Sequence, residues 1–414
     1  MQYGLIGEKL GHSFSAQIHQ KLKSNPYTLV ELSQNEIEAF LRAKNFSAIN
    51  VTIPYKTTVI PYLSHISEQA KAIGAVNTVV NRGGELWGYN TDFYGLQALI
   101  EHAGIALKNK KIAILGTGGT SKTAHAVAEF LGAKEILTVS RRAGEGVITY
   151  GELTKHQTDV NVIINTTPVG MYPNADACPV DLSVFASLEG VIDAIYNPLR
   201  TQLVLDAHNR GIKAEGGLYM LVAQAVRASE LFLDCTYDAE TTENIYRDFL
   251  KKTENIVLSG MPGAGKSTVG KHLAELLGRD FFDLDEEIVR VAGCSIPDIF
   301  AREGETAFRN LETRVLGEVL SHKKNTVLAT GGGAILRDEN VDLLHRNGKI
   351  YFIDRPLVSL LPTSDRPLAS SADAIRSRYE ERYARYCATA DCRIDGDGSI
   401  DEVAERIRKE FLNR

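Results

Sequence analysis

Two glycine-rich loops, each directly after an apolar run typical of a buried β-strand, most constrain what this chain can fold into. The first is Gly-Thr-Gly-Gly at 116–119, after Lys-Ile-Ala-Ile-Leu at 111–115. The second is Gly-Met-Pro-Gly-Ala-Gly-Lys-Ser-Thr at 260–268, and it completes the G-x-x-x-x-G-K-S pattern. Such loops place backbone amides at a helix N-terminus against phosphate groups. The chain therefore predicts two nucleotide sites, which suggests two enzymes.

The length of 414 residues predicts two or three domains rather than one core. From residue 1 to about 250, short β-rich runs alternate with helical stretches, as in βαβ units. A predicted helix at 239–251 and a short charged connector lead into a strand at 255–259, where a new α/β series begins. We predict an α/β chain with a two-lobed part at 1–252 and a P-loop domain at 253–414. The nucleotide lobe is placed at about 106–215, and the substrate lobe combines about 1–105 with 216–252.

Charge and composition narrow the function classes. The net charge of -6 gives no electrostatic reason to expect nucleic-acid or membrane partners. No apolar run reaches the roughly 20 residues of a membrane span, and the N-terminus lacks the features of a signal peptide. The five scattered cysteines fit a reducing cytosol, and Cys387 and Cys392 have no second ligand pair for a metal. We expect a cytoplasmic enzyme with small polar or anionic substrates, of unknown oligomeric state.

The residues after the first loop indicate which dinucleotide binds. The loop departs from G-x-G-x-x-G because the third glycine position is Ser121. About 20 residues further on, where NAD enzymes keep an acidic residue for the ribose, the chain has Arg141 and Arg142. Two guanidiniums favour a 2′-phosphate, although a solvated arginine pair is the alternative. The sequence predicts NADP(H), held by Gly116, Gly118, Gly119, Arg141 and Arg142.

Four segments of the N-terminal part identify a family resemblance. Gly-Glu-Lys-Leu-Gly-His-Ser-Phe-Ser at 7–15, Asn-Val-Thr-Ile-Pro-Tyr-Lys at 50–56, Gly-Ala-Val-Asn-Thr at 74–78 and Gly-Tyr-Asn-Thr-Asp at 88–92 resemble shikimate dehydrogenase. Further similar segments lie at 165–171, 193–198 and 216–224, so the resemblance covers essentially residues 1 to 250. It implies a two-lobed dehydrogenase with a Rossmann-like NADP lobe that reduces 3-dehydroshikimate to shikimate.

The resemblance also implies roles for individual residues. Reduction of a ketone needs a proton donor close to the oxygen, and Lys56 would be that acid, oriented by Asp92. A surface salt bridge is the alternative reading of this pair. Ser13 and Ser15 are similar to the family's hydroxyls for the substrate carboxylate. The other implied substrate contacts are Thr52, Asn77, Tyr196 and Gln224. Ala16 departs from the family, which often has proline there.

The second loop predicts ATP and Mg²⁺ from its own chemistry. Its amides cradle phosphates, Lys266 reaches the β- and γ-phosphates, and the Ser267 hydroxyl ligates magnesium. The pattern does not say which molecule accepts the phosphoryl group. The predicted nucleotide-binding residues are Gly260, Gly263, Gly265, Lys266, Ser267 and Thr268.

Four segments after this loop resemble shikimate kinase. They are 282–285, 304–312, 331–333 and 365–368, and the resemblance spans about 255 to 414. It implies a fold similar to nucleoside-monophosphate kinases. On a strand with alternating faces, Asp283 and Asp285 point the same way and can address one site. By resemblance, Asp283 holds magnesium through water, and Asp285 binds the acceptor hydroxyls and is a candidate to take the proton.

The remaining kinase residues are implied by the same resemblance. Arg309 and Arg382 are similar to the guanidiniums that hold the substrate carboxylate, with backbone contact from Gly332 and Gly333. Arg366 would be the lid arginine that closes over the phosphates. The lid segment at 360–365 is shorter than the family's and lacks the arginine usually found upstream of Arg366. We therefore expect an active kinase with a weakened nucleotide clamp.

Together the two resemblances imply consecutive reactions. The first forms shikimate with NADPH, and the second phosphorylates its 3-hydroxyl with MgATP, on the route to aromatic amino acids. One alternative is a quinate dehydrogenase that uses NAD. Another is a dehydrogenase whose C-terminal half is a catalytically impaired, nucleotide-binding regulatory module.

Overall fold

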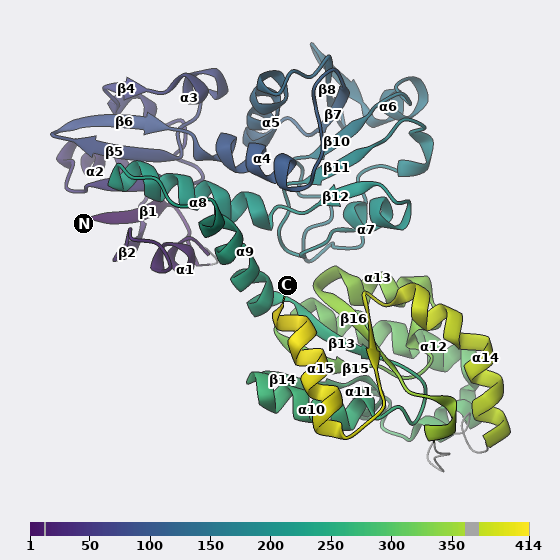
Figure 1. The fold of residues 1–414 in the computed structure, drawn as a ribbon. Coiled ribbons are helices and arrows are strands. Elements are labelled where there is room, and N and C mark those ends of the chain that lie inside the picture. The colour runs from purple at the N-terminus through teal and green to yellow at the C-terminus, as the bar shows by residue number, and fades with distance from the viewer. Residues whose placement is uncertain (12–13, 361–371, 414) are drawn as a thin grey trace. The chain divides into compact units, whose positions relative to one another are not determined.

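The computed structural model describes residues 1–11, 14–360 and 372–413, with side chains in the last range from residue 376 onward. The chain divides into two compact units, Met1–Tyr246 and Arg247–Arg414 (Figure 1). We call them unit 1 and unit 2. The division falls inside helix α9 (Glu240–Thr253), close to the predicted connector. Both units are α/β, as the sequence predicts.

The first lobe of unit 1 is built on a mixed sheet with strand order β2-β1-β3-β5-β6-β4. Strand β1 pairs parallel with β2 and β3, whereas β5 pairs antiparallel with β3 and β6. Helix α8 packs along α4 in this lobe, although the second lobe separates them in sequence. The strands are β1 (Tyr3–Gly7), β2 (Tyr27–Glu31), β3 (Ala48–Val51), β4 (His65–Ile66), β5 (Thr78–Arg82) and β6 (Glu85–Tyr89), and the helices are α1 (Ser15–Gln20), α2 (Ile37–Ala43), α3 (Glu68–Ile73), α4 (Thr91–His102) and α8 (Leu218–Leu233).

The second lobe of unit 1 has an all-parallel sheet with strand order β12-β11-β10-β7-β8-β9. Read from β9 to β12, this is the strand order of doubly wound dinucleotide-binding sheets. The direction in which successive strands are added to the sheet reverses between β7 and β10. Strand β7 is buried almost throughout because helices cover both faces of such a sheet. The strands are β7 (Lys111–Leu115), β8 (Glu135–Ser140), β9 (Val147–Thr149), β10 (Val162–Asn165), β11 (Gly190–Asp193) and β12 (Lys213–Glu215), and the helices are α5 (Gly119–Phe130), α6 (Tyr150–His156) and α7 (Gln202–Asn209).

Unit 2 is built on a parallel sheet with strand order β14-β15-β13-β16-β17. Strand β13 lies in the middle, so the loop that follows it opens at the centre of the carboxyl edge. Helix α12 bends at Gly304, whose φ of 80° and ψ of 174° are not helical. The strands are β13 (Asn255–Ser259), β14 (Asp280–Asp283), β15 (Thr326–Ala329), β16 (Gly348–Asp354) and β17 (Cys392–Asp395), and the helices are α10 (Lys266–Leu277), α11 (Leu284–Ala292), α12 (Ile296–His322), α13 (Asp338–Asn347), α14 (Ala372–Thr389) and α15 (Ile400–Leu412).

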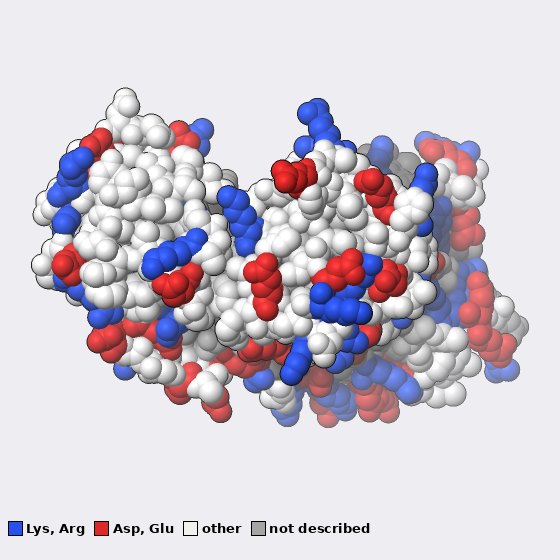
Figure 2. Space-filling model, turned by 90° about the horizontal axis from the view of Figure 1, so that it is seen from above, with Lys and Arg blue, Asp and Glu red and all other residues white. Residues whose placement is uncertain are grey.

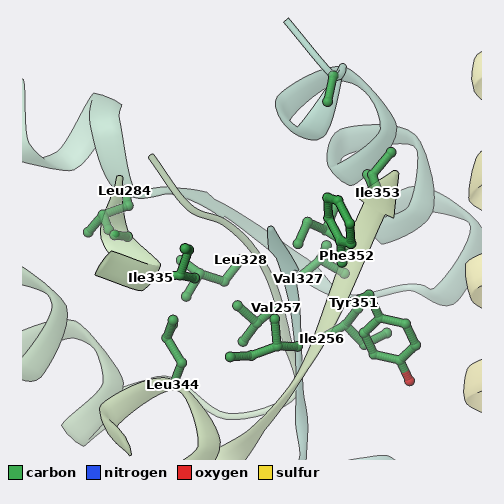
Figure 3. Close-up of a cluster of buried hydrophobic side chains, with 14 of the residues drawn as sticks. Ile256, Val257, Leu284, Val327, Leu328, Ile335, Leu344, Tyr351, Phe352 and Ile353 are labelled. Carbon is green, nitrogen blue, oxygen red and sulfur yellow. The ribbon is translucent and has the colours of Figure 1, made fainter. Parts of the chain in front are cut away.

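The core of unit 2 forms where three neighbouring strands bring their apolar side chains together. Val257 of β13, Leu328 of β15 and Phe352 of β16 are each no more than 1% exposed (Figure 3). Leu284 and Leu344, from the helices on the sheet, complete the cluster in the same view. Burial of each such side chain contributes about 1.5 to 3 kcal/mol. This packing holds the β13 carboxyl end, and therefore the loop after it, in a fixed place.

The surface carries both signs of charge. On the face drawn in Figure 2, lysine and arginine side chains are interspersed with aspartate and glutamate. In the described residues, no helix is both long and apolar enough to cross a membrane.

Candidate active sites

The first candidate site is a polar cavity of about 340 Å³ in unit 1. At its centre the Lys56 Nζ donates a hydrogen bond to the Asp92 Oδ2 over 2.6 Å. The two side chains are 31% and 20% exposed, so both are reachable from the cavity. This arrangement combines a proton donor with a group that orients it, which is what ketone reduction requires. The predicted residues that line the cavity are Ser15, Thr52, Lys56, Asn77, Asp92, Tyr196 and Gln224.

Several elements position these side chains. Thr52 directly follows β3, and Lys56 lies in the turn that comes after it. Asp92 is in the first turn of α4. Asn90 caps this helix, because its side chain accepts a hydrogen bond from the Phe93 amide. The lysine and the aspartate therefore come from segments whose place is fixed by a strand end and by a capped helix.

Asn77 is held by a hydrogen-bond network that the sequence did not predict. Its Oδ1 accepts hydrogen bonds from the Thr91 amide at 2.7 Å and from the Thr78 hydroxyl at 3.1 Å. These contacts fix the orientation of the amide, so its Nδ2 faces the Gln224 Oε1 at 3.5 Å. Asn50 supports the same group by donating to the Asn77 carbonyl. The network presents a donor and an acceptor to the cavity with little freedom to rotate.

His19 lines the same cavity but is fully buried. Its Nδ1 lies 2.6 Å from the Ser24 Oγ, and its ring stacks on Tyr27 with centroids 4.0 Å apart. Burial lowers the pKa of this imidazole to about 3. The folded unit thus keeps the ring neutral at pH values where an unfolded histidine is charged.

Replacing His19 by glutamine is expected to reduce the acid sensitivity of unit 1. The folded-state pKa lies below the unfolded one, so the unfolded chain binds more protons as pH falls from 6.5 towards 3, and stability is lost across that window. The wild type should lose about 1.4 kcal/mol per pH unit more than the variant. Urea unfolding followed by Trp87 fluorescence measures this, because Trp87 is the one tryptophan in the sequence and lies in unit 1. The exposed His156→Gln variant should keep the wild-type slope; an equal slope in the His19 variant would contradict the prediction.

The predicted dinucleotide loop lies at the point where the strand order of the second lobe reverses. Gly116 has a φ of 112°, and a Cβ there would lie 2.7 Å from the Thr166 Oγ1. A Cβ on Gly118 or Gly119 would meet nothing within 4 Å, so open space lies over the loop. Helix α5 begins here without a side-chain cap, which leaves its amides available to an anion. These features fit a pyrophosphate.

The two arginines predicted to bind the 2′-phosphate lie after the neighbouring strand. Arg141 and Arg142 are exposed and follow β8 directly.

The second candidate site is a cavity of about 530 Å³ at the carboxyl edge of the sheet in unit 2. It collects residues from the ends of β14 and β15, from the P-loop and from α12 and α14. The predicted residues that line it are Ser267, Asp283, Asp285, Arg309, Gly332, Gly333 and Arg382.

The conformation of the P-loop fits the phosphates of a nucleoside triphosphate. Gly263 and Gly265 have φ values of 84° and 86°, a conformation that favours glycine. Gly265 is the N-cap residue of α10, so no side chain caps this helix. Lys266 is 4% exposed, and its Nζ donates to the carbonyls of Gly260 at 2.9 Å and Met261 at 3.1 Å. The ammonium is therefore held over the loop where phosphates would lie.

The prediction that Asp283 and Asp285 share one strand is wrong. Strand β14 ends at Asp283, and Asp285 lies in the first turn of α11. The Asp283 Oδ1 accepts hydrogen bonds from the amides of Asp285 and Glu286, so Asp283 caps the helix. Both aspartates still line the cavity.

Ser267 and Asp283 fit a magnesium ion. The Ser267 hydroxyl donates to the Asp283 Oδ2 over 2.5 Å, which brings two hard oxygens together beside the P-loop, one for direct ligation and one for contact through water. Among the described residues, no three His, Cys, Asp or Glu side chains form a metal-binding group. A site with few protein ligands suits Mg²⁺, which binds substrate phosphates and water as well.

Three glycines at 331–333 allow Asp285 and Arg309 to lie close to the backbone on the side of the cavity where the phosphoryl acceptor would bind. A Cβ on Gly331 would lie 2.6 Å from the Asp285 Oδ1, and one on Gly333 would lie 2.2 Å from the Arg309 Nη2. The Arg309 Nη1 donates to the Glu312 Oε2 over 2.7 Å. The pKa of Glu312 is raised because its carboxyl is buried, and the charge of Arg309 only partly opposes this rise. Glu312 was not predicted, although its position three residues after Arg309 on a helix is a recognisable signal.

Comparison with known proteins decides the family. Residues 5–79 match the family model of the shikimate dehydrogenase substrate binding domain, and residues 262–412 match that of shikimate kinase. The shikimate dehydrogenase (NADP(+)) of Clostridium perfringens strain SM101 is 39% identical over 264 residues, which span 59% of this chain and 97% of the relative. The chain belongs to the shikimate dehydrogenase family. It also carries a shikimate kinase family domain.

Solved structures agree with this placement. A shikimate dehydrogenase from Peptoclostridium difficile is 36% identical with a TM-score of 0.53, and the match covers 60% of this chain and 98% of that one. A chorismate mutase/shikimate 5-dehydrogenase fusion protein from Clostridium acetobutylicum is also 36% identical, with a TM-score of 0.57 and coverage of 60% and 96%. In that second protein the dehydrogenase is fused to a chorismate mutase.

Two predicted site residues of these families lie outside the described residues. They are Ser13 of the dehydrogenase and Arg366 of the kinase lid. The lid segment after Leu360 lies outside them as well, so the expected effect of its length stays a prediction.

Proposed function

We propose that the chain catalyses two consecutive reactions of shikimate. Unit 1 reduces 3-dehydroshikimate to shikimate with NADPH, and unit 2 phosphorylates the shikimate 3-hydroxyl with MgATP. The observation that carries the proposal is that one chain holds both a lysine-aspartate pair in a polar cavity and an arginine-aspartate cavity beside a P-loop. The product of the first reaction is the acceptor of the second.

In unit 1 the chain's own residues bind the substrate and supply a proton. NADPH, when bound, supplies the hydride. Lys56 donates its proton to the ketone oxygen as negative charge develops there, and Asp92 keeps the ammonium aimed into the cavity. Thr52, Asn77 and Gln224 contact the substrate ring, and Ser15 binds the carboxylate. All four residues line the cavity.

The two arginines after β8 support NADPH over NADH. Both side chains are exposed. Burial raises the pKa of Tyr150, and the charge of the nearby Arg141 partly opposes this rise. Two guanidiniums at this place match a ribose 2′-phosphate. The arginine pair and the NADP(+) named for the relatives therefore both support NADP(H) as the cofactor of unit 1.

Replacing both Arg141 and Arg142 by alanine is expected to raise KM for NADPH by about 10-fold to 100-fold, because a phosphate loses charged hydrogen bonds. KM for NADH should not change, since NADH has no 2′-phosphate. Steady-state kinetics with each cofactor measures this, with the exposed Arg210→Ala as a control. Equal losses with both cofactors would contradict a role for the pair in recognising the 2′-phosphate.

In unit 2 the chain's residues hold an acceptor in line with a nucleotide. Lys266 contacts the transferred phosphoryl group, while Ser267 and Asp283 hold magnesium. Arg309 and Arg382 bind the shikimate carboxylate at the other side of the cavity. Asp285 lies beside the glycine loop, where it binds the acceptor hydroxyl and takes its proton.

A split assay tests the whole proposal. The purified chain is given 3-dehydroshikimate and NADPH, and NADPH oxidation is followed by absorbance. MgATP is then added, and shikimate 3-phosphate is detected by mass spectrometry. Both signals are expected. Consumption of NADPH without formation of the phosphate ester would remove the kinase half of the proposal and favour a regulatory module.

A further inference from the structure

Arg378 is a residue of the unit 2 cavity to which neither the sequence nor the comparisons assign a role. It lies on α14 four residues before Arg382, and residues four apart share one face of a helix. Both arginines line the cavity together with Arg309 of α12. Three guanidiniums from two helices therefore meet around one space.

The guanidiniums of Arg378 and Arg382 are only partly satisfied by the protein. The Nε atoms of both are buried and have no hydrogen-bond partner in the described part of the chain. The Arg382 Nη1 donates to the Gly332 carbonyl over 3.4 Å, whereas the Arg309 Nη1 donates to the Glu312 carboxylate over 2.7 Å. Buried polar groups without partners are rare and call for an explanation such as an absent ligand.

The cavity's carboxylates are largely engaged elsewhere. Asp283 accepts from Ser267 and from two helix amides, and Glu312 accepts from Arg309. The Glu286 Oε1 lies 3.3 Å from the Lys271 Nζ. Burial and the neighbouring charge of Arg382 lower the pKa of Arg378, yet an arginine stays charged in proteins. Among the described residues, none of these carboxylates forms an ion pair with Arg378 or Arg382.

We propose that Arg378 is a third guanidinium for the carboxylate of the phosphoryl acceptor, together with Arg309 and Arg382. The proposal rests on the kinase function proposed above. A carboxylate fits because it is planar and has about four acceptor positions, enough for donors from three guanidiniums. The nucleotide phosphates have their own place at the P-loop, where Lys266 lies. Arg378 would therefore set the affinity for an anionic acceptor rather than for ATP.

Arg378→Met tests the proposal, because methionine keeps the stem but removes the charge. Calorimetric titration of the full chain with shikimate is expected to show two binding events, and a Gln224→Ala variant, which loses a polar side chain of the unit 1 cavity, identifies the event in that unit. The Arg378→Met variant should weaken the unit 2 event by about 10-fold to 100-fold and leave the other unchanged. KM for shikimate in the kinase reaction should rise by the same factor, with KM for ATP unchanged. Arg376→Met, an exposed arginine on the same helix, is the matched control.

The methyl ester of shikimate separates a carboxylate contact from a structural role. The ester lacks the negative charge, so wild type and Arg378→Met should bind it with equal affinity in unit 2. An equal loss for ester and acid, or a loss confined to shikimate 3-phosphate, would overturn the proposal. Arg378→Lys should restore part of the affinity for the acid, since it restores charge without the fork.

These measurements distinguish the two proposals. A chain that binds shikimate in unit 2 but forms no phosphate ester fails as a kinase, and the titrations still decide the role of Arg378. A chain that forms the ester with unchanged KM in the Arg378→Met variant keeps its kinase function and loses this inference. Absence of any shikimate binding in unit 2 would overturn both.

Discussion

Replacing Lys56 by methionine is expected to lower kcat for reduction of 3-dehydroshikimate by about 100-fold to 10,000-fold, the usual contribution of a positioned proton donor. Methionine keeps a stem of similar length but carries no proton, so the developing alkoxide would be left to water. The Lys56 Nζ lies 2.6 Å from the Asp92 Oδ2, and this contact aims it into the cavity. The loss should appear in kcat, because the proton is needed in the transition state rather than in the bound ground state.

The measurement is NADPH oxidation at fixed pH with saturating substrate. Lys71→Met is a matched control, since Lys71 is exposed on α3 and pairs with Glu68 outside this cavity. Asp92→Asn should give a smaller loss, because it weakens the orientation of the lysine and leaves its proton in place. The kinase rate of each variant reports whether unit 2 is intact. A Lys56 variant that keeps more than a tenth of the wild-type kcat would show that another group is the proton donor.

Replacing Lys266 by methionine is expected to lower kcat for phosphoryl transfer by about 1,000-fold. The ammonium is nearly fully buried and lies over the carbonyls of Gly260 and Met261. When phosphates bind, it exchanges these carbonyls for phosphate oxygens, whose charge grows in the transition state. Its contribution is large because the site excludes water.

Formation of shikimate 3-phosphate under saturating ATP measures this effect, and calorimetric titration with MgADP separates it from nucleotide binding. Lys271→Met is the control, because Lys271 is on the same helix with its side chain 56% exposed. NADPH-dependent reduction by unit 1 should be unchanged. If the affinity for MgADP fell as far as kcat/KM, Lys266 would serve binding of the nucleotide and not the transition state.

The two nucleotide loops and their strands could be predicted because their signals are local. The predicted strand at 255–259 is β13 without change, and the run at 111–115 is β7. An apolar run before a glycine loop depends on neighbours within the same segment, so no distant contact is needed to recognise it. The families follow from other short segments, such as 50–56 and 331–333, and the comparisons confirm them.

The placement of Asp285 shows where a local pattern was interpreted wrongly. Alternation over Phe282–Asp285 suits a strand, but an aspartate followed by the acidic residues 285–287 is also typical of a helix start. The structure has the helix, because the Asp283 carboxylate satisfies two of its first amides. The sequence therefore contained the signal for a helix start. It did not show whether the helix or the strand would form.

By itself, the sequence determined two α/β units, two phosphate loops and the families to which they belong. The tertiary structure alone decided that Thr91 fixes the amide of Asn77 and that Arg378 joins Arg309 in one cavity. These pairs are close in space because separate elements pack together, and Arg309 and Arg378 lie on different helices. Local periodicity says which face of an element is apolar, but the partner of that face is set by the packing of the whole unit.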